Sequence, residues 1–234
     1  GLKRRLKAVY VKYKTEPEIF LKDQLLNNFV ENVDYISSEE VIDVIVPIYN
    51  GYDYLTQLFP TLLRTKLNAR IFLVDDKSPD PRVHEIEETF AAEHENVFII
   101  NNEENYGFVK SVNNALQRAE NHVALVNTDT VLPDLWLERL MAPILLDDKV
   151  ASTTPYTNSA TIFSFPNFCY NNPIYRGMTV DQIDEVFAHV KPRNIVAPTG
   201  VGFCMGMNKH VIDEIGTLDY ETFSKGFGEE NDWC

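Results

Sequence analysis

Two adjacent carboxylates, Asp75 and Asp76, follow the apolar run Arg70–Val74. A carboxylate at the end of a strand can accept hydrogen bonds from a uracil imide or from a ribose hydroxyl. The letters Asp-Asp-Lys-Ser-Pro are also ordinary turn chemistry at a strand exit, and for these residues alone a turn is the better interpretation. Their chemistry therefore depends on which other polar groups the fold brings beside them.

An oxygen-rich tripeptide, Asn127-Thr128-Asp129, follows a second apolar run, His122–Val126. Carboxylate and other oxygen ligands suit Mg²⁺ or Mn²⁺, which makes Asp129 a candidate metal ligand. An Asx-turn that leads into Pro133 explains an isolated tripeptide of this kind at least as well. The sequence leaves both interpretations open at this point.

A third acidic group lies near the end of the chain, where residues 226–232 read GFGEEND. The glycines give the backbone freedom, and three carboxylates are enough to place one as a general base beside a substrate hydroxyl. The alternative is the acidic start of a helix, because Glu229, Glu230 and Asp232 would all favour the positive end of the helix dipole. The two interpretations are compatible.

The chain of 234 residues carries a formal net charge of −14, with a sequence pI near 4.7. A general nucleic-acid binder needs a basic surface, so the charge excludes this class. The same acidity would repel an anionic nucleotide, and the sequence contains neither GxGxxG nor a P-loop to hold phosphates. A metal ion or a local basic patch must therefore offset the charge of any phosphate-bearing substrate.

The cysteines and histidines suggest neither a disulfide framework nor a zinc site. The three cysteines are widely spaced, and no two of the five histidines stand at metal-ligand spacing, so the surface or the core is their default place. No run approaches the roughly 18 apolar residues of a membrane helix, and the start lacks the apolar stretch of a signal peptide. The predicted location is the cytoplasm.

From residue 41 onward, short β-rich runs alternate with amphipathic helical stretches, which is typical of βαβ units. The predicted strands are Val41–Ile48, Arg70–Val74, Val97–Ile100, His122–Val126 and Lys149–Thr154. The predicted helices are Tyr52–Thr65, Pro81–Glu93, Phe108–Ala119, Asp134–Leu146, a helix from the capping box Thr179–Gln182 to Val190, and one from Asn208 to Gly216. The pattern predicts an α/β fold with a Rossmann-like, mostly parallel central sheet flanked by helices. Its ligand crevice would lie at the carboxyl ends of the strands.

Residues 1–40 are predicted to be a helical lead-in or a linker from a preceding segment. Six basic residues fall within positions 1–14. Contact with anionic lipid at the inner face of the membrane, or with a neighbouring domain, is one interpretation. A solvated helix face is the commoner explanation of such a charge run.

The ordered set VIVPIYNGYDYL, LVDDKSPD, NEENYGFVKSVNNAL, LVNTDT and GFGEENDWC resembles the family-2 inverting glycosyltransferases of the GT-A fold. Each motif is modest, but their order and spacing are highly specific. The resemblance runs from about Val41 to Cys234, and further segments are similar to those of bacterial members that build cell-surface polysaccharides. It implies a domain over 41–234 that is incomplete at its C-terminus, because many relatives place a metal-binding histidine beyond the last motif.

The resemblance also implies roles for individual residues. Asp129 would bind Mn²⁺ or Mg²⁺, although Asn127 replaces the first acid of the usual D-x-D. Glu230 matches the catalytic base, and Glu229 would orient the acceptor. The nucleotide-binding set carried over by motif position is Pro47, Tyr49, Asn50, Asp76, Asn105, Gly107, Asn127 and Thr128.

The implied reaction moves a sugar from a nucleoside diphosphate sugar, with UDP or dTDP preferred, to an acceptor hydroxyl, such as that of a growing glycan, with inversion. One alternative is a sugar nucleotidyltransferase, but that class needs a glycine-rich basic loop where this chain reads YNGYDYL. The other alternative is a catalytically silent nucleotide- or glycan-binding module of a larger synthase, because fold does not guarantee function.

Overall fold

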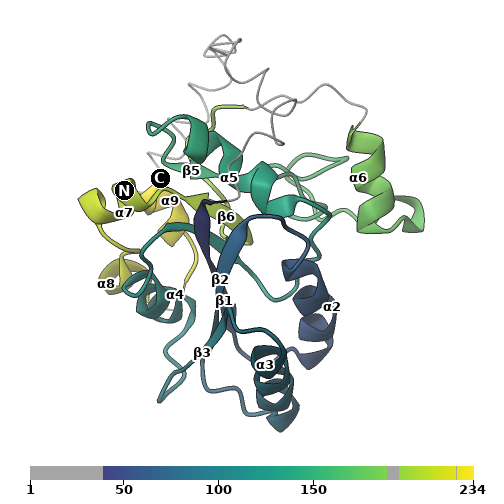
Figure 1. Cartoon of the computed structure of the whole chain (residues 1–234). Helices are drawn as coiled ribbons and strands as arrows, with labels where there is room; N and C mark the ends of the chain where they lie inside the picture. Colours follow the sequence, from purple (N-terminus) through teal and green to yellow (C-terminus); the bar gives the residue numbers. More distant parts are fainter. Residues whose placement is uncertain (1–38, 189–194, 225) are drawn as a thin grey trace.

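Within residues 39–188, 195–224 and 226–234, which the computed structural model describes, six strands form one sheet (Figure 1). The strands are β1 (Val41–Ile48), β2 (Asn68–Asp75), β3 (Val97–Asn101), β4 (His122–Val126), β5 (Ser152–Thr153) and β6 (Cys204–Met207). Their order is β3-β2-β1-β4-β6-β5. The pairs β1–β2, β1–β4 and β2–β3 are parallel, whereas β6 runs antiparallel to both β4 and β5. The predicted α/β class with a mostly parallel sheet is confirmed.

Helices cover both faces of this sheet. They are α2 (Tyr52–Leu62), α3 (Pro81–Glu93), α4 (Phe108–Leu116), α5 (Trp136–Leu146), α6 (Val180–Ala188), α7 (Lys209–Ile215), α8 (Tyr220–Phe223) and α9 (Glu229–Trp233), with a 3-10 turn η2 (Tyr175–Gly177). In Figure 1, α2 and α3 lie on one side of the sheet, and α4 and α8 lie on the other. Within the described ranges, no helix is long and apolar enough to cross a membrane.

The central strand β1 is buried on both faces, as expected for a parallel strand between helical layers. Its even-numbered side chains, such as Val44 and Val46, pack in one core with residues of α2, α3 and α5. Ile45 points the other way and packs in a second core with residues of α4 and α7. The strand is therefore fixed from both sides, and so is the position of the loop that follows it.

Helix starts follow the capping signals in the sequence. The Asp80 carboxylate accepts a hydrogen bond from the backbone N–H of Arg82, with Pro81 as the first helical residue. Thr179 and Gln182 form a reciprocal capping box at the start of α6. These local bonds confirm the predicted starts of α3 and α6.

A buried carboxylate ties together the amino-terminal ends of the strands. Asp43 is fully buried and accepts hydrogen bonds from Arg70 Nε at 2.7 Å and from the backbone N–H groups of Glu120 and Asn121. Burial alone would raise the pKa of Asp43, but the hydrogen bonds from Arg70 and Asn121 hold it below its usual value. The opposite, carboxyl-terminal edge of the sheet is left to carry the site.

Several predicted boundaries differ from those observed. The second strand extends to Asn68–Asp75, the helix after Gly107 ends at Leu116 rather than Ala119, and Lys149–Thr154 shrinks to Ser152–Thr153. Strand β6 was not predicted, because its Cys-Met-Gly-Met run lacks the β-branched residues that mark strands. Gly206 is needed there, since a Cβ would lie 2.3 Å from Thr153 Oγ1. The predicted lead-in lies outside the described residues up to position 38.

Candidate active site

A cavity of about 460 Å³ lies at the carboxyl ends of β1 and β4. These strands are parallel neighbours, so the loops that follow them meet at one edge of the sheet. The lining residues are Pro47, Tyr49, Gly51, Tyr54, Phe108, Asn127, Thr128 and Asp129. Five of them were predicted from the sequence as nucleotide- or metal-binding residues. The fold therefore brings two separate motifs into one hollow.

The wall of this cavity includes three residues that the sequence reasoning missed. Gly51, Tyr54 and Phe108 line it together with the predicted residues. Tyr54 lies in the first turn of α2, and Phe108 is the first residue of α4. The available signal was position, because the first turns of helices that follow parallel strands face the same crevice.

Asp76 does not line the cavity but supports its wall. The side chain is 4% exposed, and its Oδ1 accepts hydrogen bonds from Tyr106 N at 2.7 Å and from Asn102 Nδ2 at 2.9 Å. Its Oδ2 accepts from Gly107 N at 2.8 Å, at the start of α4. A carboxylate offers about four acceptor sites, so these three bonds leave room for about one more. Asp76 thus fixes the segment that presents Phe108 to the cavity.

The loop after β1 is held by the loop after β2. The backbone N–H of Asn50 donates to Ser78 Oγ at 2.8 Å, and Asn50 Oδ1 accepts from Asp80 N. Asn50 has a φ of 59°, a conformation that asparagine tolerates better than most residues. Asn50, Asn105 and Gly107 lie beside the cavity loops but outside the lining set, and Asn105 is exposed.

The tripeptide after β4 forms a turn and also faces the cavity. Asn127 N donates to Phe203 O at 2.8 Å, and Thr130 N donates back to Asn127 O. The turn leaves Asp129 exposed at the cavity lip. No group of three close metal-ligating side chains in the described part of the chain includes Asp129. A cation held here would therefore complete its coordination with water and substrate phosphates, as Mg²⁺ and Mn²⁺ commonly do.

One glutamate of α9 lies near the segment that also borders the cavity residue Phe108. A Cβ built on Gly226 would lie 3.8 Å from Glu229 Oε1 and 3.9 Å from Phe108 Cβ, so both residues lie next to Gly226. Glu229 is 5% exposed, and its Oε2 has no hydrogen-bond partner, like the buried Oε2 of Glu230. Burial raises the pKa of Glu229, and the charge of Glu230 adds to this effect.

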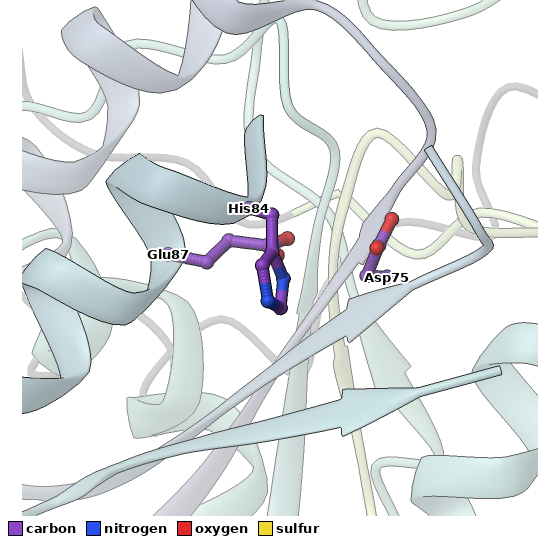
Figure 2. Close-up of side chains that lie close together, drawn as sticks. All are labelled: Asp75, His84 and Glu87. Atoms are coloured by element: carbon purple, nitrogen blue, oxygen red, sulfur yellow. The ribbon is translucent and has the colours of Figure 1, made fainter. Parts of the chain in front are cut away.

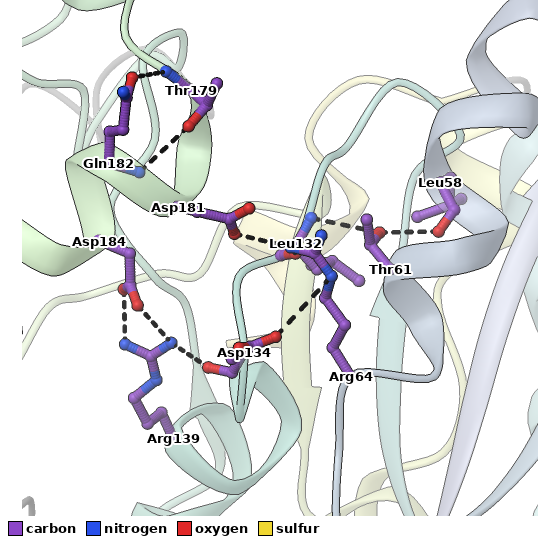
Figure 3. A network of polar contacts seen from close by, with 10 residues as sticks. All are labelled: Leu58, Thr61, Arg64, Leu132, Asp134, Arg139, Thr179, Asp181, Gln182 and Asp184. Carbon is purple, nitrogen blue, oxygen red and sulfur yellow. Dashed lines mark hydrogen bonds and ion pairs between the residues drawn. The ribbon is translucent and has the colours of Figure 1, made fainter.

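The loop between β5 and α6 exposes several aromatic side chains, among them Phe165, Phe168 and Tyr170. It is tethered through α6, which makes ion pairs to the rest of the chain (Figure 3). Asp181 accepts from Arg64 at 2.7 Å, and Asp184 accepts from Arg139 at 2.6 Å. The rings of Phe165 and Phe187 of α6 meet edge to face at 5.1 Å.

The structure defines an α/β domain with a cavity at the carboxyl edge of its parallel strands, and comparisons with known proteins give its family. The model of "Glycosyl transferase family 2" matches residues 43–216, so the chain belongs to this family. The chain is 31% identical over 121 residues to "Glycosyltransferase GlyG" of Streptococcus pneumoniae serotype 4. This alignment covers 51% of the chain and 40% of that protein. The predicted family is thereby confirmed.

Solved structures of similar fold are glycosyltransferases. A mannosyltransferase from Pyrobaculum calidifontis, in complex with GDP-Man and Mn²⁺, aligns with a TM-score of 0.59 at 14% identity over 82% of this chain and 50% of its own. GalNAc-T7 with UDP, GalNAc and Mn²⁺ aligns with a TM-score of 0.61 at 16% identity, over 82% of this chain and 39% of its own. S. aureus TarS 1-349 in complex with UDP aligns with a TM-score of 0.55 at 20% identity, over 82% of this chain and 53% of its own. The GT-A fold is therefore confirmed, and this chain spans about half or less of these relatives' length.

Proposed function

We propose that this domain transfers a sugar from a nucleoside diphosphate sugar to an acceptor hydroxyl with inversion at the anomeric carbon. The observation that carries the proposal is the cavity at the ends of β1 and β4, which has Asp129 at its lip and Phe108 in its wall. Phe108 and Glu229 of α9 both lie next to Gly226. An exposed carboxylate for a cation, an aromatic-lined hollow for the donor and a nearby carboxylate pair for the acceptor are the parts that such a transfer needs.

The donor in this proposal is a nucleoside diphosphate sugar, with UDP or dTDP preferred over other nucleotides. Proteins of similar fold bind GDP-Man or UDP in their solved complexes, which supports the diphosphate class. Tyr49 and Pro47 would contact the base, and Asn127 and Thr128 would approach the ribose and phosphates. Asp76 would contribute through its remaining acceptor site and through the α4 start that it holds.

The residues at the cavity lip fit a divalent cation. Asp129 offers an exposed carboxylate, and Asn127 offers an amide oxygen in the same turn. When bound, Mn²⁺ or Mg²⁺ would offset the charge that develops on the diphosphate leaving group. The chain itself contributes a net charge of −14, so this offset is needed for an anionic donor to bind.

The proposed base is Glu230, with Glu229 orienting the acceptor. Glu230 would take the proton of the acceptor hydroxyl while that oxygen forms a bond to the anomeric carbon. The bond from this carbon to the diphosphate breaks on the opposite face, which inverts its configuration. The acceptor class proposed is a glycan of the growing bacterial surface polysaccharide type, and Phe165, Phe168 and Tyr170 offer exposed rings near which a sugar could stack.

The test is a screen of UDP-, dTDP- and GDP-sugars for donor hydrolysis and transfer by the full-length protein with Mn²⁺. We expect turnover with a uridine or thymidine donor, and a product of inverted configuration by NMR. Binding of nucleoside diphosphate without turnover of any donor would instead favour the silent binding module. Release of pyrophosphate from a nucleoside triphosphate would favour the nucleotidyltransferase.

A further inference from the structure

A second cluster of ligand-type side chains lies behind the loop that follows β2 (Figure 2). Asp75 at the end of β2, and His84 and Glu87 on α3, each offer one ligand atom, and these three atoms lie within 4.8 Å of one another. His84 and Glu87 are three positions apart, so they share one face of the helix. The cavity described above is lined by none of these residues.

Glu87 gives this cluster its significance. Its side chain is 0% exposed, and neither Oε1 nor Oε2 has a hydrogen-bond partner among the residues that the structure describes. In Figure 2 its carboxylate extends towards the His84 ring and Asp75. A buried carboxylate without a partner is costly, so it must take up either a proton or a cation. Burial raises the pKa of Glu87 to about 8, and the Asp75 charge adds to this rise.

The surroundings of His84 complete the arrangement expected for a metal ligand. Its Nε2 lies 3.1 Å from Glu88 Oε1. A metal bound at Nδ1 would leave the Nε2–H to donate to Glu88, which is the usual way in which a carboxylate orients a metal-binding imidazole. The His84 side chain is 50% exposed, so a cation can reach the buried carboxylates from this side.

We propose that Asp75, His84 and Glu87 form a binding site for a divalent transition metal, with Zn²⁺ strongly preferred over Mg²⁺. Zn²⁺ accepts both imidazole nitrogen and carboxylate oxygen as ligands, whereas Mg²⁺ favours an octahedron of oxygens. Zn²⁺ also exceeds Mn²⁺ in intrinsic affinity for mixed nitrogen and oxygen ligands. This site is separate from the cation proposed at Asp129 and does not depend on the proposed sugar transfer.

The site is linked to the loop beside the nucleotide cavity. Asp75 Oδ1 accepts a hydrogen bond from Ser78 N at 2.9 Å, and Ser78 Oγ accepts from Asn50 N at 2.8 Å. A metal that fixes Asp75 therefore also fixes the turn that holds Asn50. The expected result of metal binding is a more stable fold with a more rigid loop after β1.

The experiment titrates Zn²⁺ alone into metal-stripped, tag-free Asp129→Ala protein by calorimetry, so that the lip of the nucleotide cavity contributes no carboxylate. We expect one equivalent of Zn²⁺ to bind and to raise the Tm. Glu87→Gln and His84→Ala, each added to this background, should weaken binding at least about 100-fold, and Glu88→Gln should weaken it about 10-fold. Glu85→Gln is the matched control, because it removes an exposed charge from the same helix.

Folding is checked by the Tm of each protein in EDTA. Glu87→Gln keeps the side-chain shape and cannot ionise, so its metal-free Tm should be no lower than that of its parent. Absence of Zn²⁺ binding to the Asp129→Ala protein would overturn the proposal. It would also be overturned if Glu87→Gln and His84→Ala bound Zn²⁺ as tightly as Glu85→Gln, or if Mg²⁺ bound as tightly as Zn²⁺.

Discussion

Glu87 also makes a quantitative prediction about stability in the absence of metal. Its carboxyl group is fully buried in the folded chain, where burial raises its pKa from the usual 4.5 to about 8. The folded state therefore keeps this proton up to about pH 8, whereas the unfolded state loses it near 4.5. The proton's contribution to stability is complete below pH 4.5 and is lost as the pH rises towards 8.

The size of the effect follows from the difference between these two values. One pKa unit corresponds to about 1.4 kcal/mol, so the free energy of unfolding should fall by about 1.4 kcal/mol per pH unit between these limits. The full loss approaches about 4 to 5 kcal/mol, a large part of the roughly 5 to 15 kcal/mol that stabilises a typical domain. Glu87→Gln cannot ionise, so it escapes this loss.

The assay is urea unfolding in EDTA at pH 5, 6, 7, 8 and 9 for the wild type, Glu87→Gln and Glu85→Gln. We expect the free energies of wild type and Glu87→Gln to be close at pH 5 and to diverge with rising pH, with Glu87→Gln the more stable. The difference should level off above pH 8, and Glu85→Gln should follow the wild type. A difference that stays constant from pH 5 to 9 would refute the reasoning, because Glu87 would then ionise alike in both states.

The remaining predictions concern the site and the sheet. Glu230→Gln should lower kcat by about 10²- to 10⁴-fold while donor binding survives. Glu229→Gln should chiefly raise the acceptor KM. The reverse result in steady-state kinetics would make Glu229 the base. Asp129→Ala and EDTA should each weaken UDP and dTDP binding by calorimetry, and unchanged affinity under both would refute the metal assignment. Asp43→Asn should lower the free energy of urea unfolding by about 3 kcal/mol or more, because the Arg70 guanidinium loses its buried carboxylate partner. A loss below about 1 kcal/mol would show that this ion pair is dispensable.

Most of the sheet could be predicted because its signals are local. The run Val41–Ile48 is apolar and β-branched throughout, and the structure has a strand with these bounds. The start of α3 was readable from Asp80-Pro81, since capping acts within a few residues. Strand β6 was not predicted because Cys204–Met207 has low intrinsic β-propensity. It forms a strand because it pairs with β4, and that long-range contact is not visible in the sequence.

The part of the site that could be predicted is the part carried by sequence motifs. Tyr49 and Asp129 each follow a predicted strand, which placed them in one crevice, and the structure has both in one cavity. The supporting role of Asp76 could not be seen, because its partners are backbone N–H groups of Tyr106 and Gly107 about 30 positions away. Backbone donors leave no trace in residue types.

The cluster around His84 was not predicted, for a related reason. The spacing rule compared histidines with one another, and His84 has no histidine partner in range along the sequence. Its neighbours in the fold are carboxylates, one of them supplied by a different element, Asp75 of β2. A ligand set that combines a strand end with a helix face appears only once parallel packing brings the two together.

The charges at this edge of the sheet support the proposal that cations bind there. The nearby lysines are already engaged: Lys77 Nζ donates to Glu103 O at 2.6 Å, and Lys110 Nζ lies 3.5 Å above the Tyr106 ring. Neither is placed by these contacts to neutralise a diphosphate in the cavity. The carboxylates at this edge, Asp75 and Asp129 among them, would repel such a ligand. Divalent metals at the two proposed sites would make the electrostatic potential at this edge positive. Removal of metal should therefore weaken donor binding by more than the loss of one contact to a phosphate would.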